Sequence, residues 1–302
     1  MKEEIGIKLL WTAGVIFAVA GSGIVLQMAL RGRSKSQSDM GTRFAVEVGM
    51  LGFVFVAAYL GGLWLAGAAM ALGLVTTAEM FGTMEAGGDR PFKLGGIAVG
   101  AACMAIAIAR PGVVPWLLPA LVVVYQALRV VPMDDPAALG ARLRRTLFGV
   151  IYPFVCLAFF VEIARTDAGF GYVVFFYGLS EVNDSAAYLI GSSIGKRKIF
   201  PRLSPNKTVE GVVGGVALTI AIGFALWFAV PTFAAWQVAL GAALVAAVGM
   251  GGDLFASRIK RRAGVKDYGD VIPTQGGVLD LYDAFAFLAP AFYYYLSLIG
   301  QI

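Results

Sequence analysis

The chain has 302 residues, of which 59% are hydrophobic and only 14% are charged, and its mean hydropathy is +0.79. This composition excludes an ordinary soluble globular protein, so we expect a polytopic membrane protein. The formal net charge of +5 is carried in short stretches between apolar runs, which favours anionic lipid headgroups and nucleotide phosphates as partners over nucleic acid. Because the chain contains no histidine, His-based triads and His-ligated metals are excluded, and oxygen ligands, typical of magnesium, remain.

Apolar runs of the length needed to cross a bilayer follow one another along the whole chain. The predicted fold class is an all-α, polytopic transmembrane bundle of about ten helices. These helices are expected at residues 7–30, 44–60, 63–81, 94–109, 113–132, 147–164, 170–190, 209–230, 234–252 and 283–300. The second and third are separated only by Gly61 and Gly62, which makes that boundary the weakest signal of a turn.

Lys and Arg residues are distributed unevenly among the predicted loops. If the N-terminus is outside, most of the 24 Lys and Arg residues fall in loops on the inner side, as the positive-inside rule requires of cytoplasmic loops. The long polar loops are therefore predicted to lie on the cytoplasmic side.

The composition changes near Arg145. The preceding half is rich in Ala, Gly, Val and Leu, and its predicted helices contain acidic residues only at Glu47 and Glu79. The following half concentrates polar groups in helices and basic loops. We interpret residues 1–145 as a transmembrane scaffold and residues 146–302 as the catalytic region.

The longest polar interval between apolar runs covers residues 252–283. It contains both acidic and basic side chains: Asp253, Asp267, Asp270, Asp280, Asp283, Arg258, Lys260, Arg261, Arg262 and Lys266. Such a mixture suits a divalent cation held together with a polyphosphate. Charge alone also permits a solvated loop with the usual basic excess.

Two ionisable residues, Glu181 and Asp184, stand inside the predicted helix 170–190. Charged groups within a membrane helix are costly, so both are expected to face a partner or a wet cavity. Asp184 and Tyr188 share one helix face, and Gly191 and Gly195 have the small-residue spacing of close helix contacts. The alternative is a packing seam with a buried polar network.

A short polar segment precedes the helix expected to begin at residue 209. Ser204, Lys207 and Thr208 would place a hydroxyl, a cation and free backbone N–H groups at that helix N-terminus, which is a reasonable phosphate cradle. Taken by itself, this segment fits a simple turn and an N-cap better than a phosphate site.

Three segments, in the same order, resemble the CDP-diacylglycerol synthases, also called phosphatidate cytidylyltransferases. The matching positions are Asn183, Asp184 and Tyr188; Ser204 to Gly211; and Ser257, Lys260, Arg261, Lys266, Asp267, Gly276, Gly277, Asp280 and Asp283. The chain departs from the family at Gln275, where the family has His, and at Leu281, where it has Arg. It therefore resembles a divergent member, either with a different acceptor or with weakened activity.

The resemblance implies attack of the phosphatidate phosphate on the α-phosphorus of CTP, giving CDP-diacylglycerol and pyrophosphate with one or two magnesium ions. A phosphate monoester is mostly dianionic near neutral pH, so no histidine base is needed. The implied catalytic residues are Asp253, Lys260, Lys266, Asp280 and Asp283. The metal ligands expected first are Asp253 and Asp280, because folding of the loop between them could bring both carboxylates to one magnesium or a pair of them. Asp184 is a further expected ligand. The expected nucleotide contacts are Lys196, Ser204, Lys207, Thr208, Arg261, Gly276 and Gly277.

The resemblance also implies a homodimer in the bacterial inner membrane, with membrane lipids around it and its site facing the cytoplasm. Two other functions remain open. A CTP-dependent lipid alcohol kinase would release CDP instead of pyrophosphate. A non-catalytic paralogue or a transporter would use its membrane-embedded acidic residues to line a pathway, namely Glu47, Glu79, Glu162, Glu181 and Asp184.

Overall fold

The computed structural model describes residues 2–9, 35–129, 136–201 and 203–302. These residues are almost entirely helical, with one two-stranded hairpin, so the protein is an all-α helical membrane protein. Within the described ranges, three helices are long and apolar enough to cross a membrane: Gly62–Ala86, Ala137–Ala164 and Ala235–Arg262. The first predicted helix, 7–30, lies largely outside the described residues, and the count of ten therefore stays a prediction.

The first part of the bundle consists of α2 (Lys35–Leu60), α3 (Gly62–Ala86), α4 (Lys93–Ala109) and α5 (Val114–Arg129). The predicted break after residue 60 is confirmed. Gly61 and Gly62 have φ angles of 64° and 50°, a left-handed conformation that glycine adopts without steric cost. This pair therefore reverses the chain with almost no loop.

The next helix is continuous but irregular. It consists of α6 (Pro136–Val150), the π-helical turn η1 (Ile151–Val155) and α7 (Cys156–Ala164). Pro153 within η1 has no N–H to donate, so the regular hydrogen-bond ladder is interrupted there. The fully buried ring of Phe154 occupies space beside Gly73 and Gly100, where any β-carbon would collide with it. Small residues on α3 and α4 therefore let this helix pack tightly.

The following segment contains α8 (Gly169–Ile194), the hairpin of β1 (Lys198–Phe200) and β2 (Ser204–Thr208), α9 (Val209–Ala225) and the short 3-10 helix η2 (Trp227–Ala229). The hairpin was not predicted; its antiparallel register pairs Lys198 with Thr208 and Phe200 with Ser204. The predicted N-cap is confirmed, because the Thr208 hydroxyl accepts a hydrogen bond from the Gly211 N–H at 3.1 Å.

The last two helices, α10 (Ala235–Arg262) and α11 (Val278–Leu298), begin or end well inside the interval predicted to be a loop. α10 continues ten residues past the predicted end at residue 252, and α11 begins five residues before the predicted start at residue 283. The loop prediction was wrong at both ends. Consequently Asp253 and Lys260 lie on α10, and Asp280 and Asp283 lie on the first turns of α11.

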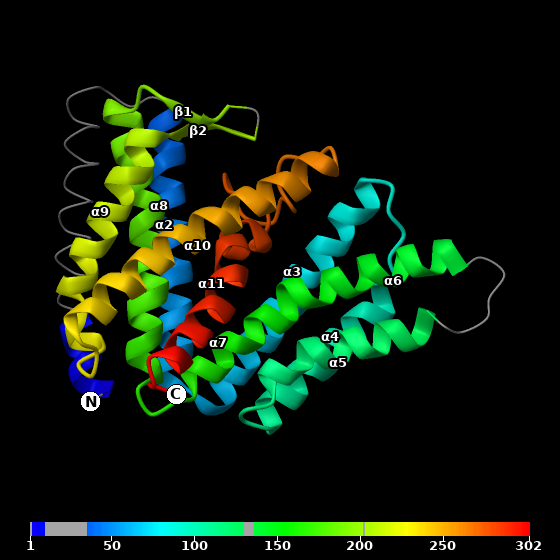
Figure 1. Ribbon diagram of the computed structural model, residues 1–302. Helices are drawn as coiled ribbons and strands as arrows, with labels where there is room; N and C mark the ends of the chain where they lie inside the picture. The colour runs from blue at the N-terminus through cyan, green and yellow to red at the C-terminus, as the bar shows by residue number, and fades with distance from the viewer. Residues whose placement is uncertain (1, 10–34, 130–135, 202) are drawn as a thin grey trace.

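The helices form two groups joined by α10 and α11 (Figure 1). α2, α8 and α9 stand together beneath the hairpin, α3 to α7 form the other side, and α10 and α11 run obliquely between them. Aromatic rings fill the contact of α8 with α11, where Phe176 stacks on Phe285 and on Phe292 with centroid distances of 5.6 Å and 4.9 Å. This apolar core packs α8 against α11, the helices that carry Asp184 and Asp283.

Candidate active site

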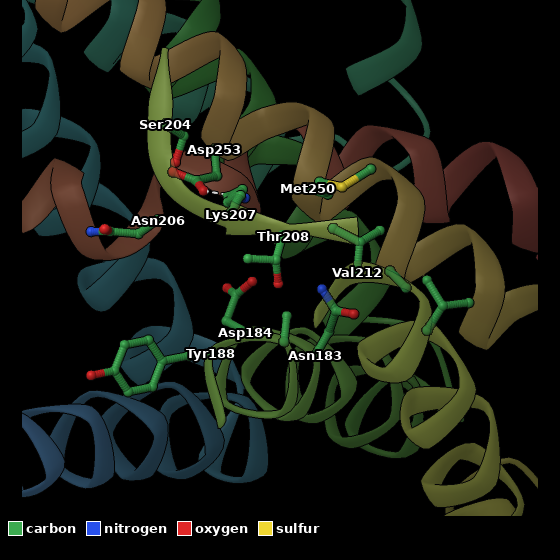
Figure 2. A pocket seen from close by; sticks show the side chains of 13 residues that line it. Asn183, Asp184, Tyr188, Ser204, Asn206, Lys207, Thr208, Val212, Met250 and Asp253 are labelled. Atoms are coloured by element: carbon green, nitrogen blue, oxygen red, sulfur yellow. Dashed lines mark ion pairs between the residues drawn. The ribbon is translucent and has the colours of Figure 1, made fainter. Parts of the chain in front are cut away.

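A pocket of about 230 Å³ opens between α8, β2, α9 and α10 (Figure 2). One part of its lining is polar and the other apolar. The polar residues are Asn183, Asp184, Tyr188, Ser204, Asn206, Lys207, Thr208 and Asp253, and the apolar ones are Ala187, Val212, Val216, Ala246 and Met250. A cavity with this division suits an amphiphilic ligand that has a charged head and an apolar tail.

An ion pair spans the polar part of the pocket. The Lys207 ammonium of β2 lies 2.5 Å from the Asp253 carboxylate of α10, drawn as a dashed line in Figure 2. Asp184 of α8 also lines the pocket, and its carboxylate repels that of Asp253. The pocket therefore brings two carboxylates and one ammonium together from three separate elements.

The local sequence explains why β2 lies so close to α8. Gly191, Gly195 and Gly211 surround the Thr208 side chain, and a β-carbon on any of them would approach its hydroxyl within 3.0 Å. The hairpin is held further by Glu210, whose carboxylate accepts hydrogen bonds from the Lys196 and Arg197 N–H groups. The glycines thus allow the contact, and Glu210 and the Thr208 cap fix the strand that carries Lys207.

A second charged cluster lies where α10 meets α11. The Lys260 ammonium donates to Asp280 at 2.7 Å and to Asp283 at 3.3 Å, and its side chain is only 11% exposed. The Asp283 carboxylate also repels that of Asp253. Asp253 therefore lies between the pocket and this buried cluster. The pocket and the cluster form one continuous polar region.

Tyr268, in the loop between α10 and α11, covers the Lys260 ammonium, which lies 4.9 Å from the ring centroid. Its own hydroxyl donates to the Ala256 carbonyl. Burial, with the nearby carboxylates of Asp283 and Asp280, raises the pKa of Tyr268 well above its ordinary value. The hydroxyl therefore remains protonated near neutral pH, and the ring screens the cluster from water.

The N–H groups at the start of α11 donate to carboxylates. Asp280 accepts from the N–H of Gly277 at 2.9 Å and from that of Tyr268 at 2.7 Å. Glu79 of α3 accepts from the N–H groups of Val278 and Leu279 at 2.9 Å and 2.7 Å. Asp280 is thus a capping residue as well as a partner of Lys260, and its side chain is only 6% exposed.

The structure does not bring every predicted site residue into the pocket. Asp184, Ser204, Lys207, Thr208 and Asp253 line it, whereas Lys260, Asp280 and Asp283 form the neighbouring cluster. The remaining predicted residues are Lys196, Arg261, Lys266, Gly276 and Gly277, and none of them lines this pocket. Three of these are exposed basic residues; the Lys266 side chain, for example, is 79% exposed.

The glycine pair of the loop is required by acidic neighbours. Gly276 has a φ angle of 100°, and a β-carbon there would lie 2.8 Å from an Asp280 oxygen. A β-carbon on Gly277 would lie 2.8 Å from the Glu79 carboxylate. The pair therefore lets carboxylates approach the backbone closely, and the nucleotide contact expected at these glycines stays a prediction.

The two departures from the family pattern have different surroundings. The Gln275 amide donates to the Glu47 carboxylate of α2 at 3.3 Å, so this position joins the loop to the N-terminal half. Leu281 is partly buried against the main hydrophobic core. An arginine at position 281 would therefore have to extend its charged end away from that apolar contact.

Several residues of this region were not predicted as site residues. Asn183 is buried and accepts a hydrogen bond from Thr219 at 3.3 Å, while Asn206 and the apolar lining became apparent only from the fold. Asn183 and Tyr188 could have been identified from the sequence, since both belong to the helix motif that matches the family. Glu79 could also have been identified, because an acidic residue within a membrane helix indicates function by default.

The oxygen atoms of the pocket could hold a magnesium ion only with the help of substrate phosphates. Within the described ranges, no group of three or more His, Cys, Asp or Glu residues is placed to hold a metal ion by itself. Asp184 and Asp253 nonetheless share one cavity with the amide of Asn183 and the hydroxyl of Ser204. Magnesium is commonly held by one or two carboxylates, with substrate phosphates and water as the remaining ligands.

A sequence profile described as the Cytidylyltransferase family matches residues 41–299. The chain is 40% identical over 154 residues to the phosphatidate cytidylyltransferase of Bacillus subtilis (strain 168), a match that covers 50% of this chain and 56% of that protein. It is 37% identical over 156 residues to the phosphatidate cytidylyltransferase of Aquifex aeolicus (strain VF5), covering 49% of this chain and 55% of that protein.

A third relative is the uncharacterized protein YnbB of Escherichia coli (strain K12), 40% identical over 124 residues, with 41% of this chain and 42% of that protein covered. The matches thus span about half the length of these curated relatives. The family profile covers most of the chain and includes every residue of the pocket and of the Lys260 cluster. This chain belongs to the cytidylyltransferase family.

Proposed function

We propose that this protein transfers the cytidylyl group of CTP to phosphatidate or a related lipid phosphate, forming CDP-diacylglycerol and pyrophosphate. The observation that carries the proposal is the pocket in which Asp184, Lys207 and Asp253 converge beside an apolar lining. The names of the bacterial relatives support the same activity. The polar part suits phosphates, and the apolar part suits the beginning of a lipid chain.

The reaction needs charge neutralisation more than proton transfer. A phosphate oxygen of the lipid attacks the α-phosphorus of CTP, the new O–P bond forms, and the bond to the β-phosphate oxygen breaks as pyrophosphate leaves. The attacking phosphate is mostly dianionic near neutral pH, so the protein has no proton to remove. Repulsion between the two anions and the charge on pyrophosphate are the obstacles that the site must reduce.

The residues of the pocket can reduce that repulsion. Lys207, which pairs with Asp253, is placed to bind a phosphate instead. Asp184 and Asp253 would hold magnesium, which offsets the charge of the triphosphate and of the departing pyrophosphate. Lys260 forms ion pairs with Asp280 and Asp283. Its positive charge offsets the negative charge of these two carboxylates, which lie near Asp253.

We further propose that the protein lies in the bacterial inner membrane with this pocket at the cytoplasmic face, where CTP is available. The hairpin and the α10–α11 loop carry many of the basic residues, in agreement with the positive-inside rule. A homodimer remains the oligomeric state that we expect from the family resemblance.

Labelled nucleotides test the reaction directly. The purified full chain in nanodiscs is supplied with CTP labelled at the α- or the γ-phosphorus. The lipid acceptor is phosphatidate, polyprenyl phosphate, diacylglycerol or polyprenol. Each reaction is run once with magnesium and once with EDTA. We expect label from the α-position in the lipid, equimolar pyrophosphate, and no transfer in EDTA. Label from the γ-position in an alcohol acceptor would instead indicate a lipid kinase. No transfer to any acceptor would contradict both enzymatic functions.

A further inference from the structure

Glu79 lies in α3, within the half of the chain that we interpret from the sequence as scaffold, yet it contacts the first turn of α11. Its two carboxylate oxygens accept separate hydrogen bonds, from the Val278 N–H at 2.9 Å and from the Leu279 N–H at 2.7 Å. A helix N-terminus leaves its first N–H groups without partners inside the helix and favours negative charge beside them. One carboxylate from a distant helix thus satisfies two of these groups.

Two glycines leave space for the Glu79 carboxylate. A β-carbon on Gly277 would lie 2.8 Å from the carboxylate, and one on Gly269 would lie 3.0 Å from its Oε1 atom. One turn further along α3, the Thr83 hydroxyl donates to the Tyr268 carbonyl at 3.5 Å. α3 therefore holds both ends of the loop segment between residues 268 and 279.

This contact bears on the charged cluster through the next residue of the chain. Asp280 follows Leu279 directly, and its carboxylate binds the Gly277 N–H on one oxygen and the Lys260 ammonium on the other. Asp283, one turn later, binds Lys260 as well. If the first turn of α11 shifted, both acidic partners of Lys260 would shift with it, and Asp283 would change its position relative to Asp253.

We propose that Glu79 is a positioning residue: it fixes the start of α11 and thereby the arrangement of Lys260, Asp280 and Asp283 beside the pocket. The effect on catalysis rests on the proposed cytidylyl transfer, whereas the effect on α11 does not.

The test compares Glu79→Gln, Glu79→Asp and, as a matched control, Glu85→Gln. Glu85 lies on the same helix and pairs with Lys93 at an exposed position. Glutamine keeps the size of Glu79 but replaces one acceptor oxygen with a donor, so one N–H of α11 loses its partner. We expect kcat for Glu79→Gln to fall roughly ten- to a hundredfold, with KM for CTP changed by less than about threefold.

Hydrogen exchange of the full chain in nanodiscs separates positioning from folding. We expect Glu79→Gln to increase deuterium uptake in peptides that cover residues 268–283, with the peptides of α3 protected as in the wild type. Glu79→Asp retains a carboxylate and should restore part of both kcat and protection, and Glu85→Gln should match the wild type.

Two outcomes would overturn the proposal. One is wild-type protection of residues 268–283 in Glu79→Gln. The other is loss of protection throughout α3 in that variant, which would show that Glu79 serves folding alone. If the wild-type chain transfers no cytidylyl group, the proposed function fails, and the exchange comparison still decides whether Glu79 fixes the start of α11.

Discussion

Lys207 and Asp253 form an ion pair across the pocket, and a triphosphate that enters there would compete with Asp253 for the ammonium group. The two residues come from β2 and α10, so the contact also joins the hairpin to the bundle. Their side chains are partly exposed, so the attraction between them is screened by water and weaker than in a buried pair. A pair of this kind can exchange partners readily when a polyanion binds.

Replacing Asp253 with Asn should reduce the rate of pyrophosphate release by about a hundredfold or more, because one of the two carboxylates that we propose to hold magnesium is lost. The variant keeps the shape of the side chain, and Lys207 remains to bind phosphate. The measurement is a coupled pyrophosphate assay with CTP and phosphatidate at saturating magnesium.

Asp270→Asn provides the matched control for Asp253. Asp270 belongs to the same polar interval but is exposed in the loop between α10 and α11, outside the pocket. This variant should retain wild-type activity. If Asp253→Asn kept more than half of the wild-type rate, or if both variants lost activity equally, the assignment of Asp253 to the site would be wrong.

Tyr268 allows a prediction about pH. Its raised pKa means that the hydroxyl of the unfolded chain ionises near the ordinary value of 10, while that of the folded chain stays protonated. Raising the pH above about 10 therefore stabilises the unfolded chain, and folding stability falls. Tyr268→Phe should lose less thermal stability than the wild type over that range.

The dependence of the reaction rate on pH should be the same in Tyr268→Phe and the wild type between pH 6 and 9. A fall in the wild-type rate toward pH 9 that is absent from the variant would show that the Tyr268 hydroxyl ionises in this range, and would contradict its raised pKa.

Asp184 was predictable because a charged group inside a membrane helix is costly unless it faces a partner or a wet cavity, and Lys207 because it precedes a helix N-terminus. Asp184 and Lys207 were both predicted as site residues, and both line the pocket. Asp280 was expected to share a metal with Asp253, but its oxygens bind Lys260, Tyr268 and Gly277. Nothing in a one-dimensional pattern distinguishes a carboxylate that caps a helix from one that holds a metal, since both stand at the same helix N-terminus.

The packing of α8 against α9 depends on small residues where the two helices meet beneath the hairpin. A β-carbon on Gly211 would lie 2.6 Å from the Ala187 backbone carbonyl oxygen, an atom that cannot rotate away. Gly211→Ala should therefore force the helices apart at the pocket, with a loss of roughly 1 to 3 kcal/mol in stability. Both the melting temperature in nanodiscs and the cytidylyl transfer rate should decrease.

Gly67→Ala is the control for Gly211, because Gly67 also lies inside a helix but faces open space. Alanine favours the helix by about 0.5 to 1 kcal/mol relative to glycine, so this variant should be neutral or slightly more stable. An unchanged melting temperature for Gly211→Ala would show that the helices have room for the extra carbon.

Helix positions followed from hydropathy, but helix ends did not. Each predicted apolar run from residue 44 onward is occupied by a helix. The ends of α10 and α11 were wrong because the helices continue beyond the apolar runs as polar turns. Lys260, Arg261 and Arg262 occupy the last turn of α10, where positive charge is favourable. The hairpin was missed because its short strands are mostly polar.

The molecule as a whole joins its two halves through the acidic residues of the first. Glu47 of α2 binds Gln275, and Glu79 of α3 binds the start of α11. The division at residue 145 stays a prediction, but these contacts show that the N-terminal half does more than surround the site. Sequence separation of about two hundred residues hides such contacts, since no local pattern relates an acidic residue in one helix to an N–H group in another.

If the proposed function is correct, the phosphates of CTP and a divalent ion bind together in the pocket between α8, β2, α9 and α10. Electron paramagnetic resonance of the Mn²⁺–CTP complex, added to the purified chain in nanodiscs, measures this binding. The wild type should bind the complex, and the double variant Asp184→Asn with Asp253→Asn should bind it roughly a hundredfold more weakly. Equal affinity of the two proteins for the complex would contradict the claim.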